Sequence, residues 1–230
     1  MRPRPKKKKY PAASKIKMSP LYPAFLDLKG RKCVIAGGGK VAQRKIGALL
    51  KAGAVVWVYS PALTLSLSML KKKGLIRHFP GGCGKRELKG AFLVFAATDR
   101  PAENEKIAKM AHGLGLPVNV ASGEGKSSFI VPSVARRGPL VLAVSTSGAS
   151  PAMSRAIRLE LEKFYGKEFS GYLKGLSRIR AKALKGKIPP VRRKQLFKRL
   201  ASGDIIKSIR AGDLVSPEDA LADTFLQEIS

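Results

Sequence analysis

A run of three glycines between a hydrophobic segment and a helical one constrains the fold of this chain more than any other feature. Residues 33–36 predict a buried strand, and residues 41–52 predict a helix that follows almost at once. Gly37, Gly39 and Ala42 have the G-x-G-x-x-A spacing of a dinucleotide-binding turn. Such a turn lets a pyrophosphate approach the backbone, and the helix N-terminus offers it unpaired N–H groups and a partial positive charge.

Apolar runs and helical patterns alternate after this turn. The run 91–97 has the continuous hydrophobicity of a central parallel strand that is buried on both faces. The order predicts an α/β fold, a Rossmann-like doubly wound parallel sheet. We expect strands at 33–36, 54–59, 76–79, 91–97 and 117–120, and helices at 41–52, 65–73 and 102–112.

The pattern changes beyond Gly125. Residues 128–133 and 140–145 predict two antiparallel β segments of another unit, and residues 152–164 predict an amphipathic helix. Further helices follow, broken once at Pro189-Pro190. The expected domains are a disordered basic arm at 1–20, the dinucleotide-binding domain at 21–126, a small α+β segment at 127–165 and a helical domain at 166–230.

The charge of the chain predicts an anionic partner. Lys and Arg number 45 against 15 Asp and Glu, which gives a formal net charge of +30. The arm is basic without a single carboxylate, and a second basic block covers residues 174–210 on helical sequence. A solvated basic surface is the alternative explanation. The chain lacks the aromatic platform or reading motif of a nucleic-acid binder, so we do not expect nucleic acid as the partner.

Several other classes of protein are not expected. No apolar run approaches the roughly 20 residues that span a bilayer, and the basic N-terminus lacks the apolar stretch of a secretion signal, so we expect a cytoplasmic protein without a membrane segment. Cys33 and Cys83 lack metal-ligand spacing and are predicted to be free thiols. No metal site of the protein itself is predicted.

Four separated segments match one family in order and spacing. They are 34–45 with the three glycines, 96–99 (Ala-Ala-Thr-Asp), 118–120 together with 128–133, and 143–151. On these segments the chain resembles precorrin-2 dehydrogenase, the siroheme synthase module that in some members is also a sirohydrochlorin ferrochelatase. The resemblance extends over about residues 21–200.

The resemblance implies an activity and partners. It implies oxidation of precorrin-2 to sirohydrochlorin with NAD⁺ as cofactor, in some members followed by insertion of Fe²⁺ or Co²⁺ into the macrocycle. It also implies an intertwined homodimer that is built by the segment 127–165, with the basic helical domain on the tetrapyrrole side. Precorrin-2 carries eight carboxylates, which suits a cleft rich in Lys and Arg.

The resemblance also places the cofactor. Residues of the glycine turn would hold the pyrophosphate, and the Ser-Pro turn after the second strand would meet the ribose. The chain has no carboxylate between Asp27 and Glu87, so the acid that usually binds the ribose is missing, as is common in this family. NAD and NADP therefore both stay open. The predicted cofactor residues are Gly37, Gly38, Gly39, Lys40, Val41, Ser60, Pro61, Ala62 and Thr98.

One departure from the family concerns the proton that leaves with the hydride. The family's proposed catalytic Asp, three residues after the Asn of the last strand, is Ser122 here. A serine hydroxyl is no general base. Glu124, Asp99 or His112 could take over the proton, Ser122 could keep an orienting role, or the chain could have lost oxidation. The last alternative makes it a non-catalytic tetrapyrrole- or nucleotide-binding protein.

The predicted substrate-binding residues follow from the remaining motifs. They lie in the last strand, the segment after it and the hydroxyl-rich turn at 145–151, and they have simpler alternative roles. Asp99 could cap the helix that starts at Pro101, His112 could interact with the dipole of its helix, and Ser150 could cap the helix that starts at Pro151. The predicted substrate residues are Asn119, Ser128, Thr146, Ser147 and Arg155.

Overall fold

A computed structural model describes residues 21–121, 126–186 and 188–221 of the 230-residue chain. It divides the chain into two compact units, one up to Val131 and one from Pro132 onward. The expected boundary at 126/127 lies a few residues earlier. The predicted arm 1–20 lies outside the described residues. So do Ser122 and Glu124.

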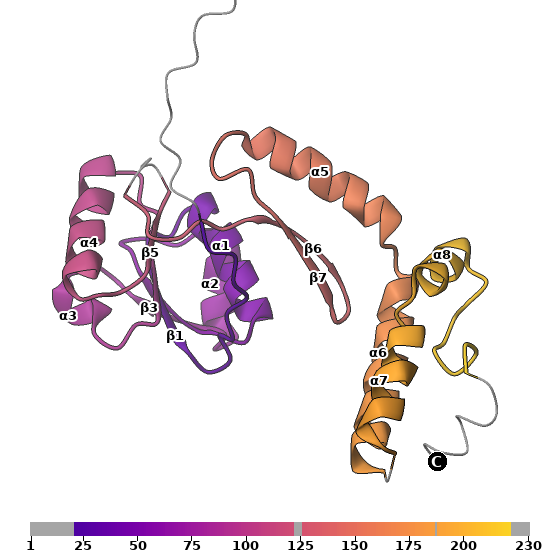
Figure 1. Ribbon diagram of the computed structural model, residues 1–230. Helices are drawn as coiled ribbons and strands as arrows, with labels where there is room; N and C mark the ends of the chain where they lie inside the picture. Colours follow the sequence, from indigo (N-terminus) through magenta and orange to yellow (C-terminus); the bar gives the residue numbers. More distant parts are fainter. Residues whose placement is uncertain (1–20, 122–125, 187, 222–230) are drawn as a thin grey trace, which may run out of the picture. The chain divides into compact units, whose positions relative to one another are not determined.

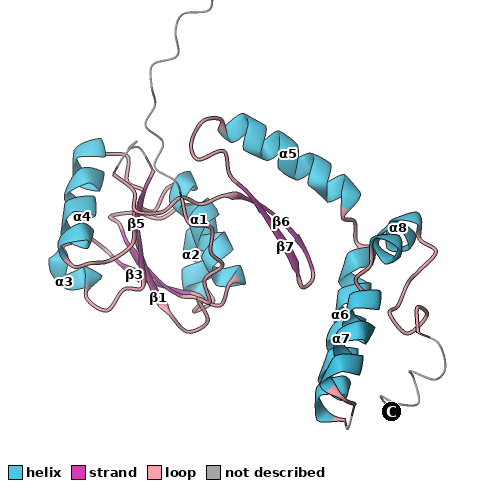
Figure 2. Ribbon diagram, viewed as in Figure 1, coloured by secondary structure: helices cyan, strands magenta, loops and turns pink. Residues whose placement is uncertain are grey.

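The first unit is a five-stranded parallel sheet with helices on both faces (Figures 1 and 2). The strand order is β3-β2-β1-β4-β5, with β1 in the middle and β3 and β5 at the edges. The predicted doubly wound parallel sheet is therefore confirmed. Its strands are β1 (Lys32–Ala36), β2 (Val55–Tyr59), β3 (Ile76–Phe79), β4 (Leu93–Ala96) and β5 (Val118–Val120), and its helices are α1 (Lys40–Lys51), α2 (Leu65–Lys72), α3 (Lys85–Leu88) and α4 (Pro101–Gly113).

Alternate residues of the strands build two cores. Ile35 of β1 packs with Ile46 and Leu49 of α1 on one face, while Val34 packs with Ile107 of α4 on the other. All four residues of β4 are buried, as its unbroken hydrophobic sequence predicted. The four-residue helix α3 was not predicted. Its N-cap is Gly84, whose N–H donates to the Glu87 carboxylate at 2.9 Å.

The second unit consists of a hairpin and four helices. Strands β6 (Ser133–Arg137) and β7 (Leu140–Val144) pair antiparallel. Tyr172 links two of the helices, because its hydroxyl donates to Leu200 O at 2.9 Å. The predicted break at Pro189-Pro190 separates α6 from α7. The helices are α5 (Pro151–Phe164), α6 (Glu168–Lys185), α7 (Pro190–Arg199) and α8 (Gly203–Ala211).

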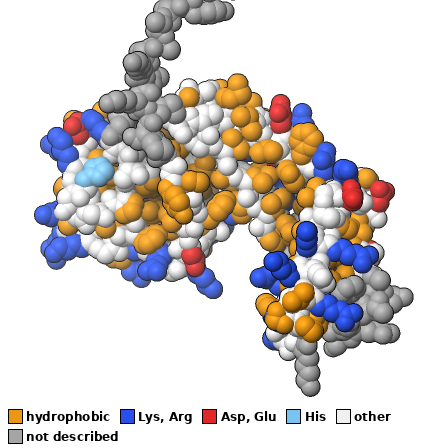
Figure 3. All heavy atoms as spheres, in the orientation of Figure 1, with side chains coloured by type: hydrophobic (Ala, Val, Ile, Leu, Met, Phe, Trp, Pro, Cys, Tyr) orange, Lys and Arg blue, Asp and Glu red, His pale blue; other side chains and the backbone are white. Residues whose placement is uncertain are grey.

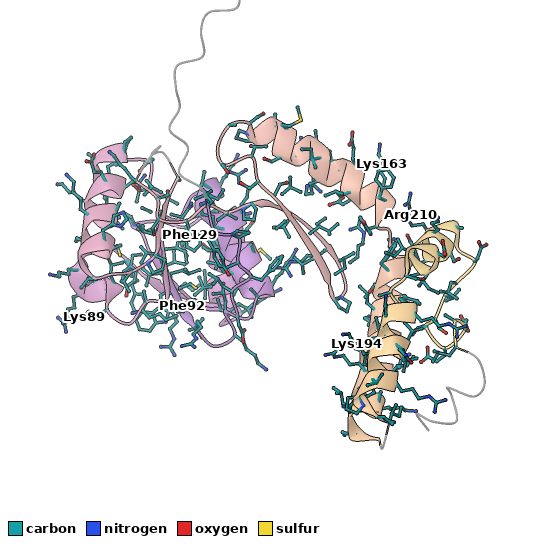
Figure 4. All side chains as sticks on the ribbon, viewed as in Figure 1. Lys89, Phe92, Phe129, Lys163, Lys194 and Arg210 are labelled. Carbon is teal, nitrogen blue, oxygen red and sulfur yellow. The ribbon has the colours of Figure 1, made fainter. Side chains whose placement is uncertain are left out.

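One predicted β segment was wrong in its position. Residues 128–132 form no strand of the hairpin, which starts only at Ser133. Instead, Phe129 packs edge-on against Phe95 of β4, with ring centroids 5.4 Å apart, and Ser128 binds the edge of β5. Figure 4 shows Phe129 on the first unit. This apolar contact keeps residues 128–129 on the sheet, and Pro132 then interrupts any ladder because it has no N–H.

Candidate functional site

The glycine turn after β1 is built so tightly that two of its positions exclude any side chain. Gly37 has φ +121°, and a Cβ there would lie 2.2 Å from Ala97 O at the end of β4. A Cβ on Gly38 would lie 2.0 Å from Ala62 O and 2.6 Å from Ser60 Oγ. The turn is therefore packed directly against the ends of two neighbouring strands, which fixes the position of the α1 N-terminus.

The N-terminus of α1 is open where a pyrophosphate would bind. Gly39 is the N-cap, no side chain accepts from the first N–H groups, and no acidic residue occupies the first turn. Nothing lies within 4 Å of a Cβ placed on Gly39, and Lys40 and Val41 are exposed. Free N–H groups, the helix dipole and the Lys40 ammonium suit a diphosphate. The predicted pyrophosphate residues thus fit a dinucleotide.

The Ser-Pro turn after β2 holds itself together without a charged group. Ser60 is buried, and its hydroxyl donates to Ala62 O at 2.8 Å. On the other side His78 Nε2 of β3 lies 2.9 Å from Ser60 O. Because its proton is used within the turn, the buried Ser60 hydroxyl fixes the shape of this turn, while Pro61 and Ala62 are exposed beside it.

A buried asparagine fixes the end of β4 and was missed at the level of sequence. Asn104 of α4 is fully buried. Its Oδ1 accepts from Thr98 N at 3.0 Å and from Thr98 Oγ1 at 2.8 Å, and its Nδ2 donates to Thr98 O at 3.0 Å. Thr98 is thereby locked beside Gly37. A polar residue at a helical position that should be apolar was the signal in the sequence.

The edge of β5 is covered by residues 126–129, which we call the return segment. Val120 N donates to Ser127 Oγ at 2.9 Å, and Val118 N donates to Ser128 Oγ at 2.7 Å. The Asn119 amide donates to Phe129 O at 3.0 Å and accepts from Lys45 Nζ at 2.6 Å. The structure thus brings Asn119 and Ser128 together, and it adds Lys45, which ends the matching segment 34–45 but was given no role from the sequence.

Two groups that were candidates for the proton have simple local positions. Asp99 is exposed and does not cap α4, whose N-cap is Arg100 without a side-chain cap, so that alternative was wrong. His112 is exposed at the end of α4, and its Nε2 lies 3.0 Å from Lys126 O at the start of the return segment. Ser122 and Glu124 lie in the interval of sequence between β5 and this segment, outside the described residues.

The second unit carries the hydroxyl-rich turn. Thr146 Oγ1 donates to Ser150 O at 3.0 Å, and it lies 3.0 Å from the Oγ of buried Ser154. Ser150 caps α5 by accepting from Met153 N, as predicted. Ser147 has φ +53°, the one positive φ outside glycine in the described residues. Such strain is typical of turns whose shape serves a purpose beyond packing.

The basic residues of the second unit differ in how free they are. Arg155 of α5 is exposed and available to an anionic ligand. Arg158 and Arg137 are both paired with Glu162. A hollow of about 510 Å³ lies near Lys163 and Arg210 (Figure 4), but its lining also contains Glu160 and Glu168, so its mixed charge favours no particular ligand.

Other kinds of site were searched within the described residues. They contain no group of three or more His, Cys, Asp or Glu side chains that could hold a metal ion. Nor does any helix in the same ranges have the length and apolar character needed to cross a membrane.

We expect both cysteines to resist thiol reagents in the native protein. Cys33 and Cys83 are free and buried, and burial raises the pKa of Cys33 to about 11 and that of Cys83 to about 12. Because the folded state keeps both protons, this contribution to stability is full below the unfolded thiol pKa of about 8.5 and falls as the pH rises above it. A disulfide-exchange dye at pH 8 should label neither thiol until denaturant is added. Rapid labelling of either without denaturant would contradict this.

Two family models match the chain. Residues 24–133 match the family described as "Putative NAD(P)-binding", which agrees with the site at the glycine turn, and residues 137–163 match "Sirohaem biosynthesis protein central". The first unit is thus an NAD(P)-binding domain.

Curated relatives and a solved structure agree with these models. Siroheme synthases of Nitrosococcus oceani and Nitrosospira multiformis are each 36% identical, over 86% and 83% of this chain. The chain spans only 42% and 41% of their length. The solved structure of SirC, precorrin-2 dehydrogenase, matches with a TM-score of 0.75 and 29% identity, over 91% of this chain and 98% of that one. The chain belongs to the family of the siroheme synthases and precorrin-2 dehydrogenase.

Proposed function

We propose that this chain oxidises precorrin-2 to sirohydrochlorin with NAD⁺, in siroheme biosynthesis. The observation that carries the proposal is the open phosphate cradle at the α1 N-terminus, in a chain that matches nearly the whole length of a precorrin-2 dehydrogenase. Bound NAD⁺ would supply the hydride acceptor. The protein's own part is to hold the pyrophosphate at Gly39 and Lys40 and to orient the substrate.

We propose NAD as the cofactor, since the ribose turn offers nothing to bind a 2′-phosphate. Residues 60–64 (Ser-Pro-Ala-Leu-Thr) contain neither Lys nor Arg, and the Ser60 hydroxyl already donates within the turn. A 2′-phosphate usually needs a cation at this place. Titrating the protein with NADH and with NADPH while following bound-nucleotide fluorescence tests this, and tighter binding of NADPH would reverse the choice.

A direct assay tests the oxidation. The full chain is mixed with precorrin-2 and NAD⁺, and absorbance is followed for NADH and for the sirohydrochlorin spectrum. Equal amounts of both products are expected. If neither appears while the tetrapyrrole and NADH still bind, the chain is the non-catalytic binding protein that Ser122 keeps as an alternative. Adding Fe²⁺ or Co²⁺ as substrate to the same cuvette shows whether metal insertion follows.

Ser122→Asp is expected to raise the oxidation rate, or to leave it unchanged where another group already takes the proton. The substitution would provide a carboxylate where the family has one, and a positioned general base contributes about 100-fold or more to a rate. The comparison is kcat of both proteins over the same pH range. A large fall in kcat would instead show that this loop works by a different mechanism. A carboxylate elsewhere, such as Glu124 or Asp99, would in that case be the base.

We further propose that the chain is a homodimer, paired through the hairpin and α5. Only Ser154 of the 14 residues of α5 is buried, and none of the five apolar residues of β7 is. Met153, Ile157, Leu159 and Val134 are exposed, and Figure 3 shows hydrophobic side chains over α5. Exposed apolar side chains on a helix and on the hairpin beside it are stabilised when they are covered, and a second copy supplies such a cover symmetrically.

Light scattering in solution tests the pairing. We expect the mass of two 24.7 kDa chains for the wild type and of one chain for Ile157→Glu, because a charge in the apolar contact must be desolvated. The control is Lys163→Glu on the same helix, because Lys163, unlike Arg155, is not a predicted substrate residue. A monomeric wild type would overturn the proposal.

A further inference from the structure

A lysine of α1 reaches across to the last strand of the sheet. Lys45 Nζ lies 2.6 Å from Asn119 Oδ1 and 5.3 Å from the centroid of the Phe95 ring. The side chain is half-buried, and burial lowers its pKa, with a smaller contribution from Arg44. Within the described ranges, no carboxylate forms an ion pair with Lys45. Desolvating this ammonium group costs free energy of folding, and an apolar side chain at the same position would avoid that cost.

The contact of Lys45 determines which way the Asn119 amide points. An ammonium group only donates, so it selects the carbonyl oxygen of the amide. The NH₂ group must then point the other way, where it donates to Phe129 O at 3.0 Å. With the opposite orientation of the amide, two donors would face each other at Lys45 and two acceptors at Phe129.

The Asn119 amide is one of the ties that hold the return segment. Other hydrogen bonds join the segment to β5: Ser128 N donates to Val118 O at 2.8 Å, and the N–H groups of Val118 and Val120 donate to the hydroxyls of Ser128 and Ser127. His112 also contacts Lys126 O at the start of the segment. Among these contacts, Lys45 acts on the Asn119 amide, which could otherwise turn over.

We propose that Lys45 is a positioning residue for the oxidation, which fixes the amide of Asn119, a predicted substrate residue, and through that amide holds the return segment. This inference rests on the proposed function. It gives Lys45 no contact with the substrate or the cofactor.

Hydrogen exchange tests the positioning without any turnover. Lys45→Met keeps the length of the side chain and removes the donor, and the probe is the exchange of backbone amides in the ligand-free full chain. We expect amides of residues 127–131 to exchange at least tenfold faster, while those of β1 keep their rate. Lys51→Met, at the exposed end of the same helix, is the matched control and should change neither. Unchanged exchange at 127–131 in Lys45→Met overturns the positioning.

A double-mutant cycle tests the role in the reaction. The four proteins are the wild type, Lys45→Met, Asn119→Leu and the double variant, and kcat/KM for precorrin-2 is measured with the Kd for NADH. We expect Lys45→Met to lose at least tenfold in kcat/KM in the wild-type background and less than twofold in the Asn119→Leu background. NADH binding should stay within twofold throughout, since the glycine turn is untouched.

The outcomes separate the two proposals. If the wild type shows no turnover, the proposed function fails, and so does the part of Lys45 in the reaction. The hydrogen-exchange result then still decides whether Lys45 holds the return segment. If the wild type is active and Lys45→Met has the same kcat/KM, the inference about Lys45 fails while the proposed function stands. The same holds if the losses in kcat/KM of the two single variants multiply in the double variant. Asn119→Leu and the double variant both leave Phe129 O without its donor, so we expect the two to melt at the same temperature, within about 1–2 °C. A further large fall in the double variant would show that Lys45 stabilises the fold through contacts other than Asn119.

Discussion

Gly37→Ala is expected to abolish nucleotide binding. The new Cβ would lie 2.2 Å from Ala97 O, and the backbone at φ +121° is strained by about 1–3 kcal/mol for a residue with a side chain. The turn can accept the methyl group only by moving away from the end of β4, which also moves the N–H groups of α1. We expect the Kd for NADH to rise at least about 100-fold, which corresponds to about 2.7 kcal/mol of lost binding. Fluorescence titration measures it.

Gly47→Ala is the matched control for this substitution. Gly47 lies within α1, the helix that follows the glycine turn, and nothing lies within 4 Å of the Cβ that alanine would add. There the change should leave NADH binding intact and raise the free energy of unfolding by about 0.5–1 kcal/mol, because alanine is the better helix former. Equal NADH affinity in Gly37→Ala and the wild type would show that the nucleotide does not use this turn.

Asn104→Ala is expected to destabilise the first unit strongly. It removes three hydrogen bonds to Thr98 from a fully buried site and leaves the donors and acceptor of Thr98 without these partners. Losses of this kind cost about 1–3 kcal/mol for each group left unpaired, so we expect a total of about 3 kcal/mol. The melting temperature should fall by roughly 6–12 °C in a calorimetric scan. NADH should protect the variant less than the wild type, since Thr98 lies beside Gly37.

Lys106→Ala, an exposed position on the same helix, should melt within about 1–2 °C of the wild type. If Asn104→Ala matched this control, the buried amide would be a minor part of the fold. Because Asn104 and Gly37 both act on the end of β4, their combined effect on NADH binding should be smaller than the product of the two.

Most of the sheet could be predicted from the sequence because its signals are local. Strand β4 is a continuous apolar run, α1 has an apolar face, and the glycines stand between strand and helix, so each element and their order follow from neighbouring residues. Pro151 and Ser150 likewise predicted the start of α5. These signals do not depend on what the chain touches elsewhere.

The parts that were missed depend on partners far along the chain. Lys45 and Asn119 are 74 positions apart, and although Lys45 lies in the matching segment 34–45, nothing near it in the sequence shows that its partner is Asn119. Residues 128–133 have an extended, apolar pattern that suits a hairpin strand as well as it suits a segment packed on Phe95. The sequence could not decide between the two, because the choice rests on where Phe129 finds a neighbour.

The covered edge of β5 has a practical consequence for cutting this protein into pieces. An uncovered edge strand exposes a row of unpaired N–H and C=O groups, which templates aggregation. The hydroxyls of Ser127 and Ser128 accept from the N–H groups of Val120 and Val118, so these groups cannot pair with a strand of another chain. A fragment that ended at residue 126 would lack Ser127 and Ser128 and is expected to precipitate. A fragment that ran to Val131 would keep both serines and is expected to stay in solution.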